Sequence, residues 1–237
     1  MKTKLKIIGI IPARGGSKSI KLKNIIKINN KPLLHYTAIE ALKSKYIQDT
    51  YISTDNKEIA TVAVNEGLKF LGFRPKYLSN DKSRSIDSIT HLINKIRLKY
   101  KYKPDLIVIL QPTSPLRKAI HIDNAIKLYL KYKPSSVVSV VKVPHNYNPE
   151  SIMKINSKKY LEGVKKKLNE QKTNRHKKKT YIARNGAAIY IVPYDTLINK
   201  KSLFGNRSFP YLMDKISSID IDDKEDLYLA ESVIKNS

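Results

Sequence analysis

Short apolar runs alternate with amphipathic helical segments along this chain, and that order constrains its fold more than any other feature. The runs are rich in Ile, Leu and Val, as strands buried on both faces are. They lie at 5–11, 51–53, 69–73, 106–110 and 137–143. Helical spacing of apolar residues is found between them, at 32–43, 56–65, 86–96 and 122–130. The alternation predicts an α/β fold with a doubly wound, mostly parallel sheet.

The pattern changes after Pro149. Residues 158–179 are polar, strongly basic and weakly periodic, and a mobile loop is their plainest interpretation. The sheet pattern resumes at 187–192 and 216–221, and a helix is expected over 224–234. The chain is therefore expected to divide into a core and a smaller inserted region. The core is assigned to 1–149 and 216–237, and the insertion to 150–215.

The charge is strongly positive: 46 Lys and Arg against 20 Asp and Glu give +26. Such a balance is typical of nucleic-acid-binding proteins. The excess, however, is scattered lysine, and no zinc-finger, RNP or basic-zipper pattern is present. Tyr and Lys alternate over 99–103, but this stretch follows a helical pattern and precedes Pro104, which favours a solvated helix end over a base-stacking platform. The charge favours anionic substrates, and no nucleic-acid partner is expected.

Composition excludes other classes. The chain has no cysteine, so disulfides and thiolate metal sites are not possible. No apolar stretch approaches the ~20 residues of a membrane span, and the N-terminus lacks the apolar region of a signal peptide. We therefore expect a soluble, cytoplasmic protein with no membrane partner.

The first apolar run ends in a segment suited to binding phosphates, residues 12–18 (PARGGSK). Gly15 and Gly16 allow backbone N–H groups to turn toward an anion, while Arg14 and Lys18 add positive charge. Ligands bind at this end of strands in open α/β sheets. A plain Gly-Gly turn with solvated charges is the alternative. The spacing is not that of a Walker loop.

A second polar segment, 111–117 (QPTSPLR), follows the apolar run at 106–110. Its two prolines restrict the backbone, so Gln111 is expected at the end of the strand. An amide offers both donors and an acceptor, which suits a sugar hydroxyl or amide. The alternative is a proline-rich turn whose polar residues only cap the next helix.

The segment 218–222 (SIDID) is the best candidate for a metal site. In a strand, Ile219 and Ile221 would face the core, and Asp220 and Asp222 would share the other face. Two such carboxylates repel each other unless a cation lies between them, and hard oxygen ligands suit Mg²⁺. Alternatively, Asp222 or Asp223 only caps the helix expected after it.

Together these segments resemble the CMP-sialic acid synthetases (acylneuraminate cytidylyltransferases). Residues 12–24 match the family motif P-A-R-x-x-S-K-G-x-x-x-K-N except at Ser19, where the family usually has Gly. The family strings L-Q-P-T-S-P-L-R and S-I-D-I-D are matched in full at 110–117 and 218–222. Shorter matches are Ser53-Thr54-Asp55, Arg74-Pro75 and Asn80-Asp81 followed by Ser85. The resemblance runs from about residue 6 to 235.

The resemblance implies a Rossmann-like nucleotidyltransferase fold and a cytidylyltransferase activity. The enzyme would join CTP to a 2-keto sugar acid of the nonulosonic (sialic) type and release pyrophosphate. Mg²⁺ would be the cofactor, with Asp220 and Asp222 as ligands, and the catalytic residues would be Arg14, Lys23 and Asp222. The implied nucleotide-binding residues are Ala13, Arg14, Gly15, Ser17, Lys18, Lys23, Asn24, Arg74 and Ser85.

For the sugar acid, the resemblance implies contacts from a second group of residues: Gln111, Arg175, Arg184, Asn185, Tyr190 and Phe204. The family pattern R-x-N-G-A-I-Y differs here, because Arg184 directly precedes Asn185 and an extra Ala lies before Ile189. One extra residue either turns Tyr190 to the other face of its strand or is absorbed as a bulge. The family's insertion reaches over a second subunit, so a homodimer is expected, with Arg175 acting on the partner's sugar site.

Two other functions are weighed against this one. Another nucleotidyltransferase, acting on 3-deoxy-manno-octulosonate or a sugar phosphate, would share the fold, but the strings at 110–117 and 218–222 argue against it. A basic RNA-binding protein would show steeply salt-dependent RNA affinity and no pyrophosphate release from CTP.

Overall fold

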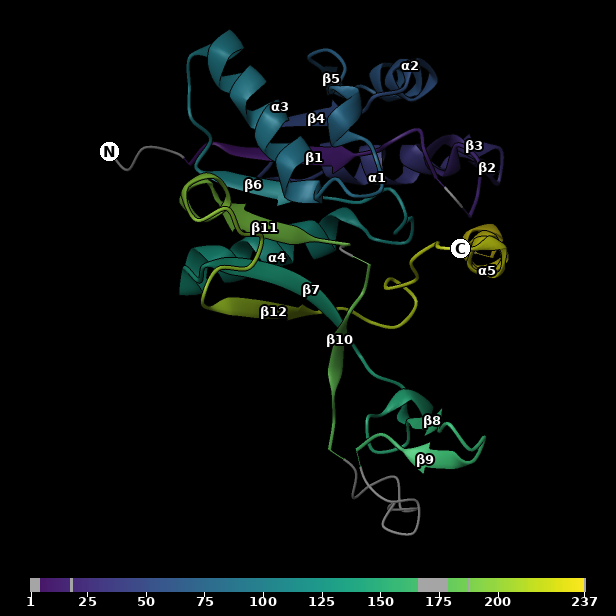
Figure 1. The fold of residues 1–237 in the computed structure, drawn as a ribbon. Helices are drawn as coiled ribbons and strands as arrows, with labels where there is room; N and C mark the ends of the chain where they lie inside the picture. Colours follow the sequence, from purple (N-terminus) through teal and green to yellow (C-terminus); the bar gives the residue numbers. More distant parts are fainter. Residues whose placement is uncertain (1–4, 18, 166–178, 187, 237) are drawn as a thin grey trace.

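The computed structural model describes residues 5–17, 19–165, 179–186 and 188–236. Its centre is an eight-stranded sheet in the order β10-β7-β11-β6-β1-β4-β5, with β12 also paired to β7 (Figure 1). The sheet strands are β1 (Ile7–Pro12), β4 (Asp49–Ser53), β5 (Lys69–Phe70), β6 (Leu106–Ile109), β7 (Ser136–Lys142), β10 (Ile182–Arg184), β11 (Tyr190–Pro193) and β12 (Ser208–Leu212).

The sheet is mostly parallel, as predicted. β1 pairs in parallel with β4 and β6, and β4 with β5. β11 is antiparallel to both β6 and β7, between which it lies. β12 adds in parallel to β7 on the edge away from β11. The carboxyl ends of β1 and β6 therefore lie side by side, and the loops carrying Arg14 and Gln111 leave the sheet there.

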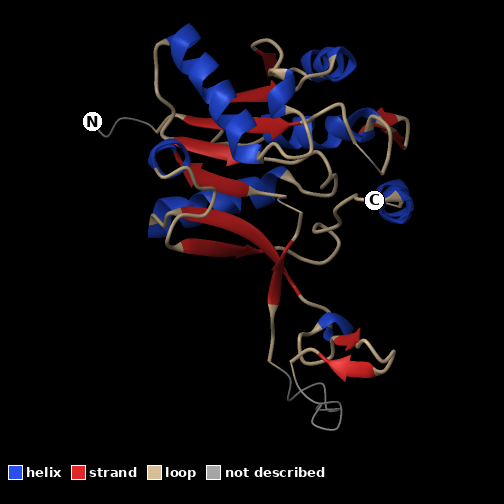
Figure 2. Ribbon diagram, viewed as in Figure 1, coloured by secondary structure: helices blue, strands red, loops and turns tan. Residues whose placement is uncertain are grey.

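Helices cover both faces of the sheet (Figure 2). They are α1 (Leu33–Leu42), α2 (Lys57–Asn65), α3 (Ser85–Tyr100), α4 (Ala119–Tyr132) and α5 (Lys224–Lys235). One core cluster joins α1, α2 and α4 to one face of the sheet, and another joins α3 to the opposite face. Ile86, Ile89, Ile93 and Ile96 of α3 are buried, as their spacing predicts. None of the described helices combines the length and apolar character of a membrane span.

A third, smaller cluster holds the C-terminal helix in place. Ile20, Ile28, Leu33 and Ile221 are buried with Ala230 of α5. The small antiparallel pair β2 (Lys27–Ile28) and β3 (Lys31–Pro32) lies beside this helix (Figure 1). α5 and the segment before it are thereby brought to the carboxyl end of the sheet.

The strand expected at 216–221 is not formed. Residues 215–218 turn instead, and Asp214 Oδ1 accepts a hydrogen bond of 2.9 Å from the Ser217 N–H. The alternation of Ile and Asp survives without a strand, because Ile221 is buried and its N–H donates to the Thr113 carbonyl at 2.8 Å. The sheet strand of this region is β12, which the sequence analysis did not predict.

Two further strands extend away from the sheet (Figure 1). β8 (Met153–Ile155) and β9 (Leu161–Gly163) form an antiparallel pair with Ile155 71% and Tyr160 70% exposed. β9 lies within the stretch 158–179 that was expected to be a loop, while 166–178 lies outside the described residues. The division at 149 and 215 stays a prediction: β10, β11 and β12 lie between those limits and pair with the main sheet.

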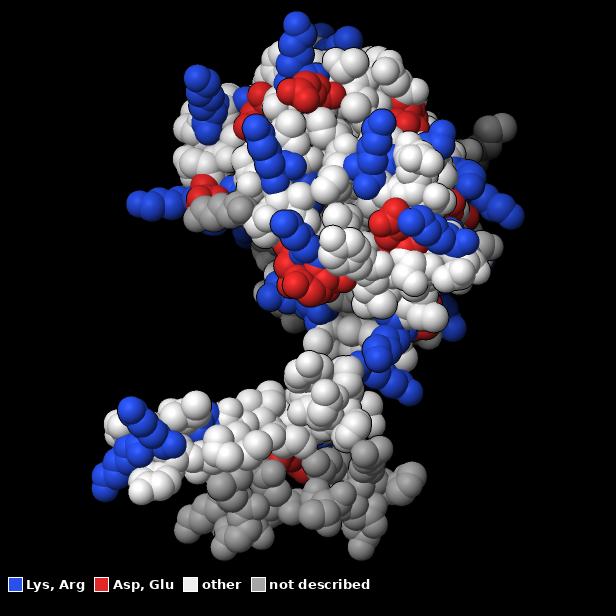
Figure 3. Space-filling model, turned by 90° about the vertical axis from the view of Figure 1, so that its right-hand side faces the viewer, with Lys and Arg blue, Asp and Glu red and all other residues white. Residues whose placement is uncertain are grey.

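Figure 3 shows the distribution of charge on one face of the molecule. Lys and Arg side chains are spread over this face with Asp and Glu among them, and they do not gather into one stripe.

At the end of α3, Lys101 adopts a left-handed conformation (φ 55°), and Lys6 Nζ lies 4.3 Å from the centre of the Tyr102 ring. Residues 99–101 thus end a helix, as the sequence favoured.

Candidate active site

Two cavities meet at the carboxyl ends of β1 and β6. The smaller has a volume of about 260 Å³, and its lining includes three arginines. The larger, of about 760 Å³, contains two carboxylates, an arginine and two aromatic rings. Pro12, Ser85 and Gln111 line both cavities. The two therefore form one cleft, with a strongly cationic compartment and a mixed polar and apolar one.

Arg14 and Arg74 supply charge to the smaller cavity. Arg14 Nη1 lies 2.9 Å from Asp81 Oδ1, and the Arg14 side chain is 37% exposed. Arg74 is buried, and its Nε has no hydrogen-bond partner among the described residues. Burial lowers the pKa of Arg74, while Asp55 raises it and Arg14 lowers it further. Two guanidinium groups near each other in one cavity favour an anionic ligand.

The loop after β1 is held by residues that the sequence assigned to nucleotide binding. The Gly15 N–H donates to Asp55 Oδ1 at 2.9 Å, and a Cβ on Gly15 would come within 2.9 Å of Asn56 Cβ. Asn24 is buried and donates from Nδ2 to the Arg14 carbonyl at 2.9 Å. Ala13 is buried, and its N–H donates to the Ser53 carbonyl at 2.9 Å. These contacts fix the backbone from which the Arg14 side chain extends.

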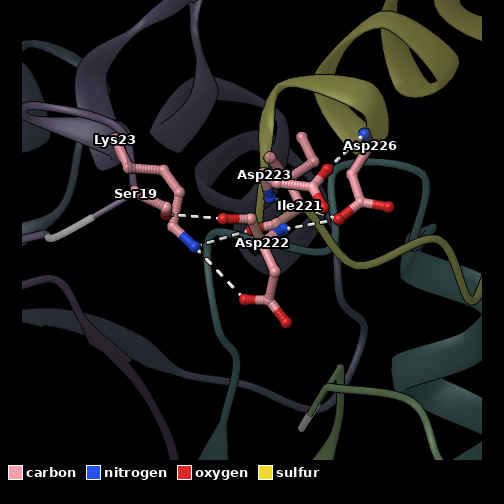
Figure 4. A network of polar contacts seen from close by, with 6 residues as sticks. All are labelled: Ser19, Lys23, Ile221, Asp222, Asp223 and Asp226. Carbon is pink, nitrogen blue, oxygen red and sulfur yellow. Dashed lines mark hydrogen bonds and ion pairs between the residues drawn. The ribbon is translucent and has the colours of Figure 1, made fainter.

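Lys23 connects this loop to the segment at 220–222 (Figure 4). Its Nζ donates to the Ile221 carbonyl at 2.7 Å and lies 3.3 Å from Asp222 Oδ1. Ser19 Oγ donates to the Asp222 carbonyl at 2.5 Å. Ser19, which stands where the family usually has Gly, thus adds a contact to the same segment. Asp222 keeps its side chain 79% exposed toward the cavity.

Asp220 lies deeper in the wall of the larger cavity. Its Oδ1 is buried with no hydrogen-bond partner among the described residues. Burial raises the pKa of the Asp220 carboxyl to about 6; a hydrogen bond from Thr113 lowers it, Asp222 raises it and Lys23 lowers it. An ionised carboxylate with an unused buried oxygen, next to a second carboxylate, favours a bound cation.

Gly186 is what leaves room for Asp220. Its φ is +64°, and a Cβ there would lie 1.8 Å from Asp220 Oδ2. With the backbone as it stands, no side chain fits at this position without displacing the Asp220 carboxylate. Gly186 therefore shapes the wall of the cavity.

Aromatic and basic side chains form the rest of the larger cavity. The Tyr190 and Phe204 rings meet edge to face with centroids 5.6 Å apart, and the Arg184 guanidinium lies 5.7 Å from the centre of the Phe204 ring. Gln111 and Leu203 also line the cavity. The combination offers a cation for a carboxylate, an amide for hydroxyl groups and an apolar wall.

Tyr190 lines the larger cavity although an extra Ala precedes Ile189. Arg184 pairs with Val140 and Tyr190 with Val138, so only Ser139 of β7 separates the two pairs. Arg184 and Tyr190 both line the larger cavity. The role of Tyr190 in sugar binding stays a prediction.

Asn185 is placed differently from the other expected sugar contacts. It is buried and does not line the cavity. Its Oδ1 accepts from Ser139 Oγ at 2.7 Å, and its Nδ2 donates to Ser218 Oγ at 3.0 Å. The sugar contact expected of Asn185 stays a prediction; in the structure its amide joins β7 to the segment before Asp220.

The family model of the cytidylyltransferases matches residues 8–236. The chain belongs to the cytidylyltransferase family. This family member is 36% identical over 229 residues to an N-acylneuraminate cytidylyltransferase of Escherichia coli, covering 96% of the chain and 52% of that protein. The chain thus spans about half the length of that relative.

Other relatives match over their whole length. This cytidylyltransferase family member is 34% identical to a CMP-N,N'-diacetyllegionaminic acid synthase of Legionella pneumophila, with 98% of the chain and 97% of that protein covered. Its fold is similar to that of a CMP:2-keto-3-deoxy-manno-octonic acid synthetase solved with CTP, with a TM-score of 0.70, 16% identity, and coverage of 98% and 99%. The expected nucleotidyltransferase fold is confirmed.

The structure brings together most of the residues named from the sequence of this family member. Arg14, Arg74 and Ser85 line the smaller cavity. The larger is lined by Gln111, Arg184, Tyr190, Phe204, Asp220 and Asp222. For Ser17 the structure shows only a backbone hydrogen bond to the Gly15 carbonyl, at 3.2 Å. Lys18 and Arg175 lie outside the described residues, so their roles stay predictions.

Sequence reasoning missed other residues at the cleft. Arg84 lines the smaller cavity and pairs with Asp87, with Nη2 to Oδ1 at 2.9 Å. Ser88 lines it one helical turn after Ser85. Arg84 occupies the N-cap position of α3 and falls within the short match at 80–85, and Ser88 lies in the first turn of the helix, so the helix start was the available signal.

Proposed function

We propose that this protein transfers the cytidylyl group of CTP to the anomeric hydroxyl of a nonulosonic (sialic-type) sugar acid. The hydroxyl oxygen forms a bond to the α-phosphorus of CTP, and the bond from that phosphorus to the bridging oxygen of the β-phosphate breaks. Pyrophosphate leaves with the electron pair, and the hydroxyl proton is lost to solvent. The products are the CMP-sugar and pyrophosphate.

The observation that carries the proposal is the shape of the cleft. A cavity lined by arginines shares Pro12, Ser85 and Gln111 with a cavity that holds two carboxylates, Arg184 and an aromatic wall. A nucleoside triphosphate suits the first, and a carboxylated sugar suits the second. Their shared wall is where the hydroxyl and the α-phosphate would meet. The names of the relatives from Escherichia coli and Legionella pneumophila support the same pair of substrates.

Positioning and charge account for the chemistry asked of the protein. Arg14 and Arg74 neutralise the triphosphate, and the Arg14 fork suits charge that builds up in the transition state. The Lys23 ammonium lies beside Asp222, where it can neutralise charge on the leaving pyrophosphate. Gln111 and Arg184 orient the sugar acid through its hydroxyl and carboxylate groups.

Asp220 and Asp222 fit Mg²⁺ as the cofactor. The unused buried oxygen of Asp220 and the exposed carboxylate of Asp222 are hard donors on one cavity wall. No group of three or more His, Cys or acidic side chains suited to a metal occurs in the described part of the chain. Phosphate oxygens and water would therefore complete the coordination, and the bound ion would neutralise phosphate charge.

We further propose a homodimer. The β8–β9 pair extends from the body and exposes apolar residues that a partner would cover: Ile155, Tyr160 and Leu161 are 58–71% exposed. If Arg175 acts on the partner's site, mixing inactive Arg175→Ala with inactive Asp222→Ala subunits should restore part of the activity, because one hybrid site keeps both residues. Absence of rescue after verified subunit exchange would mean that each site is built from one chain.

The decisive experiment is pyrophosphate release from Mg-CTP with a panel of sugar acids. The panel contains N-acetylneuraminic, diacetyllegionaminic, pseudaminic and 3-deoxy-manno-octulosonic acids, with UTP as the control donor and EDTA as the control for the metal. We expect release with CTP and at least one nonulosonic acid, since Tyr190, Leu203 and Phe204 offer an apolar wall to an acyl group. Turnover with 3-deoxy-manno-octulosonate alone would overturn the substrate class. Binding of RNA without any release of pyrophosphate would overturn the proposal that the protein is an enzyme.

A further inference from the structure

Arg117 is a fully buried cation that the reaction proposed above does not use. Its side chain is 0% exposed, yet it bears a guanidinium at the end of the segment 110–117. Nη1 donates to the Gln111 carbonyl at 3.1 Å and to the Ala188 carbonyl at 2.7 Å, and Nη2 donates to Thr37 Oγ1 at 2.5 Å. Nε has no partner among the described residues.

The two carbonyls belong to two separate segments at the cleft. Gln111 lines both cavities, while Ala188 lies between Gly186 and Tyr190, which line the larger one. One guanidinium nitrogen therefore bridges two cavity-lining segments that are 71 residues or more from each other in the chain. Thr37 on α1 completes the contact, because its Oγ1 also donates to the Gln111 carbonyl at 3.3 Å.

Burying this charge is costly, which argues for a specific use. Desolvation disfavours a buried guanidinium, and here it lowers the pKa of Arg117, against the attraction of Glu40 and Asp220. No carboxylate within hydrogen-bond distance of it is found among the described side chains; its partners are two carbonyls and a hydroxyl. An apolar residue would fill the same space without that cost, but the Ala188 carbonyl would lose this donor and the Gln111 carbonyl would keep only the Thr37 hydroxyl.

We propose that Arg117 is a positioning residue that sets the distance between the Gln111 segment and the backbone at Ala188, and so the width of the sugar-acid cavity. The proposal rests on the proposed function for its substrate. The nucleotide cavity depends on it less, because Arg14, Arg74 and Ser85 come from other segments. Only a planar fork with several donors reaches all three acceptors at once; a lysine reaches one or two.

The first test separates the Michaelis constants of the two substrates. Arg117→Met should raise KM for the sugar acid at least tenfold and leave KM for CTP within about twofold, the scale of losing one or two charged hydrogen bonds. Arg117→Lys should recover part of the loss. An equal rise in both constants, or no change in either, would overturn the positioning role.

Two further variants distinguish a specific effect on the sugar-acid cavity from a general loss of folding. Thr37→Val removes the hydroxyl between Arg117 and Gln111 and should shift KM for the sugar acid in the same direction by about threefold. Ser44→Ala is the matched control: Ser44 Oγ donates to Asp123 Oδ1 at 2.6 Å, a buried contact after α1 that does not touch the cleft. It should lower stability without moving either KM, and a KM shift in Ser44→Ala equal to that in Thr37→Val would also overturn the proposal.

Amide hydrogen exchange tests the same role without any substrate. In Arg117→Lys, exchange should rise about tenfold over 185–190 and 111–116 and stay unchanged over 7–17 and 85–96. Uniform acceleration across these segments would mean general destabilisation. If the wild-type protein releases no pyrophosphate with any sugar acid, the proposed function fails, while this exchange pattern still decides whether Arg117 holds the two segments together.

Discussion

The two halves of the cleft are built in different ways. The nucleotide half is lined almost entirely by two stretches of chain, 12–14 and 74–88, and its chemistry is positive charge on arginines. The sugar half collects residues from 85–89, 109–111, 183–190, 203–204 and 220–222. Buried polar contacts of Asn185 and Arg117 hold those segments together. The smaller cavity is thus built from a few short stretches of chain, whereas the larger one depends on packing between segments that are distant in the sequence.

The largest expected effect lies in the nucleotide half. Arg14→Ala removes the partly exposed fork that faces the triphosphate and should lower kcat about 100-fold or more. Lys21→Ala, an exposed cation of the same loop, is the matched control and should change kcat less than threefold. Steady-state pyrophosphate release measures both. Equal losses in the two variants would mean that net charge, and not the position of Arg14, binds the phosphates.

The carboxylates at the border of the two halves come next. Asp222→Asn keeps the shape of the side chain but removes the charge opposite Lys23, and it should reduce turnover by about 100-fold at fixed Mg²⁺. Asp223→Asn is the control, because Asp223, the residue that caps α5, does not line the cleft, and Asn caps a helix as well as Asp does. A Mg²⁺ titration of activity should shift to higher concentration in Asp222→Asn alone. Normal turnover in Asp222→Asn would mean that its carboxylate holds no cation that the reaction needs.

A single methyl group should distinguish the sugar half from the nucleotide half. Gly186→Ala places a Cβ against Asp220 at a positive φ, so kcat/KM for the sugar acid should fall at least tenfold while CTP binding persists. Gly72→Ala is a matched control, since Gly72 has φ +94° and its new Cβ would meet only the end of the Lys95 side chain. Calorimetric titration with CTP and the kinetics of both variants check the comparison. A loss of CTP affinity in Gly186→Ala would show that the halves are not separable.

The same contrast explains how far the sequence could be interpreted. Strand–helix alternation predicted the central sheet and the helices that cover its faces. In the structure Asn56 caps α2, with its Oδ1 accepting from the Ile59 N–H at 3.0 Å. The strand expected at 216–221 was wrong because the Ile and Asp alternation there reflects packing against Ile28 and Leu33, not sheet pairing. β12 was missed because Pro210 interrupts its pattern, which an edge strand tolerates.

Residues whose role is to hold others were the hardest to predict. Asn185 and Arg117 belong to sequence motifs, and a motif does not show whether a side chain contacts the ligand or lies behind the wall of the cavity. That distinction depends on partners far away in the chain, such as Ser218 for Asn185 and Ala188 for Arg117. Arg14 and Arg74 themselves line the smaller cavity, so their place at the cleft could be predicted without knowledge of such contacts.

The smallest expected effect is on stability, and it concerns Asp220. Burial raises the pKa of this carboxyl to about 6 from an ordinary value of 3.8, so the folded protein binds the proton more tightly than the unfolded chain. The proton's contribution to stability is therefore fully present below pH 3.8 and is lost as the pH rises through 6. Asp220→Asn has no such proton. Without Mg²⁺, its free energy of unfolding relative to wild type should rise by about 1–2 kcal/mol between pH 4.5 and 7. Urea unfolding of both proteins at the two pH values measures the difference, and the other titrating groups cancel in it. A difference that does not change with pH would mean that Asp220 ionises normally, and the cation at the border of the two halves would lose its strongest structural support.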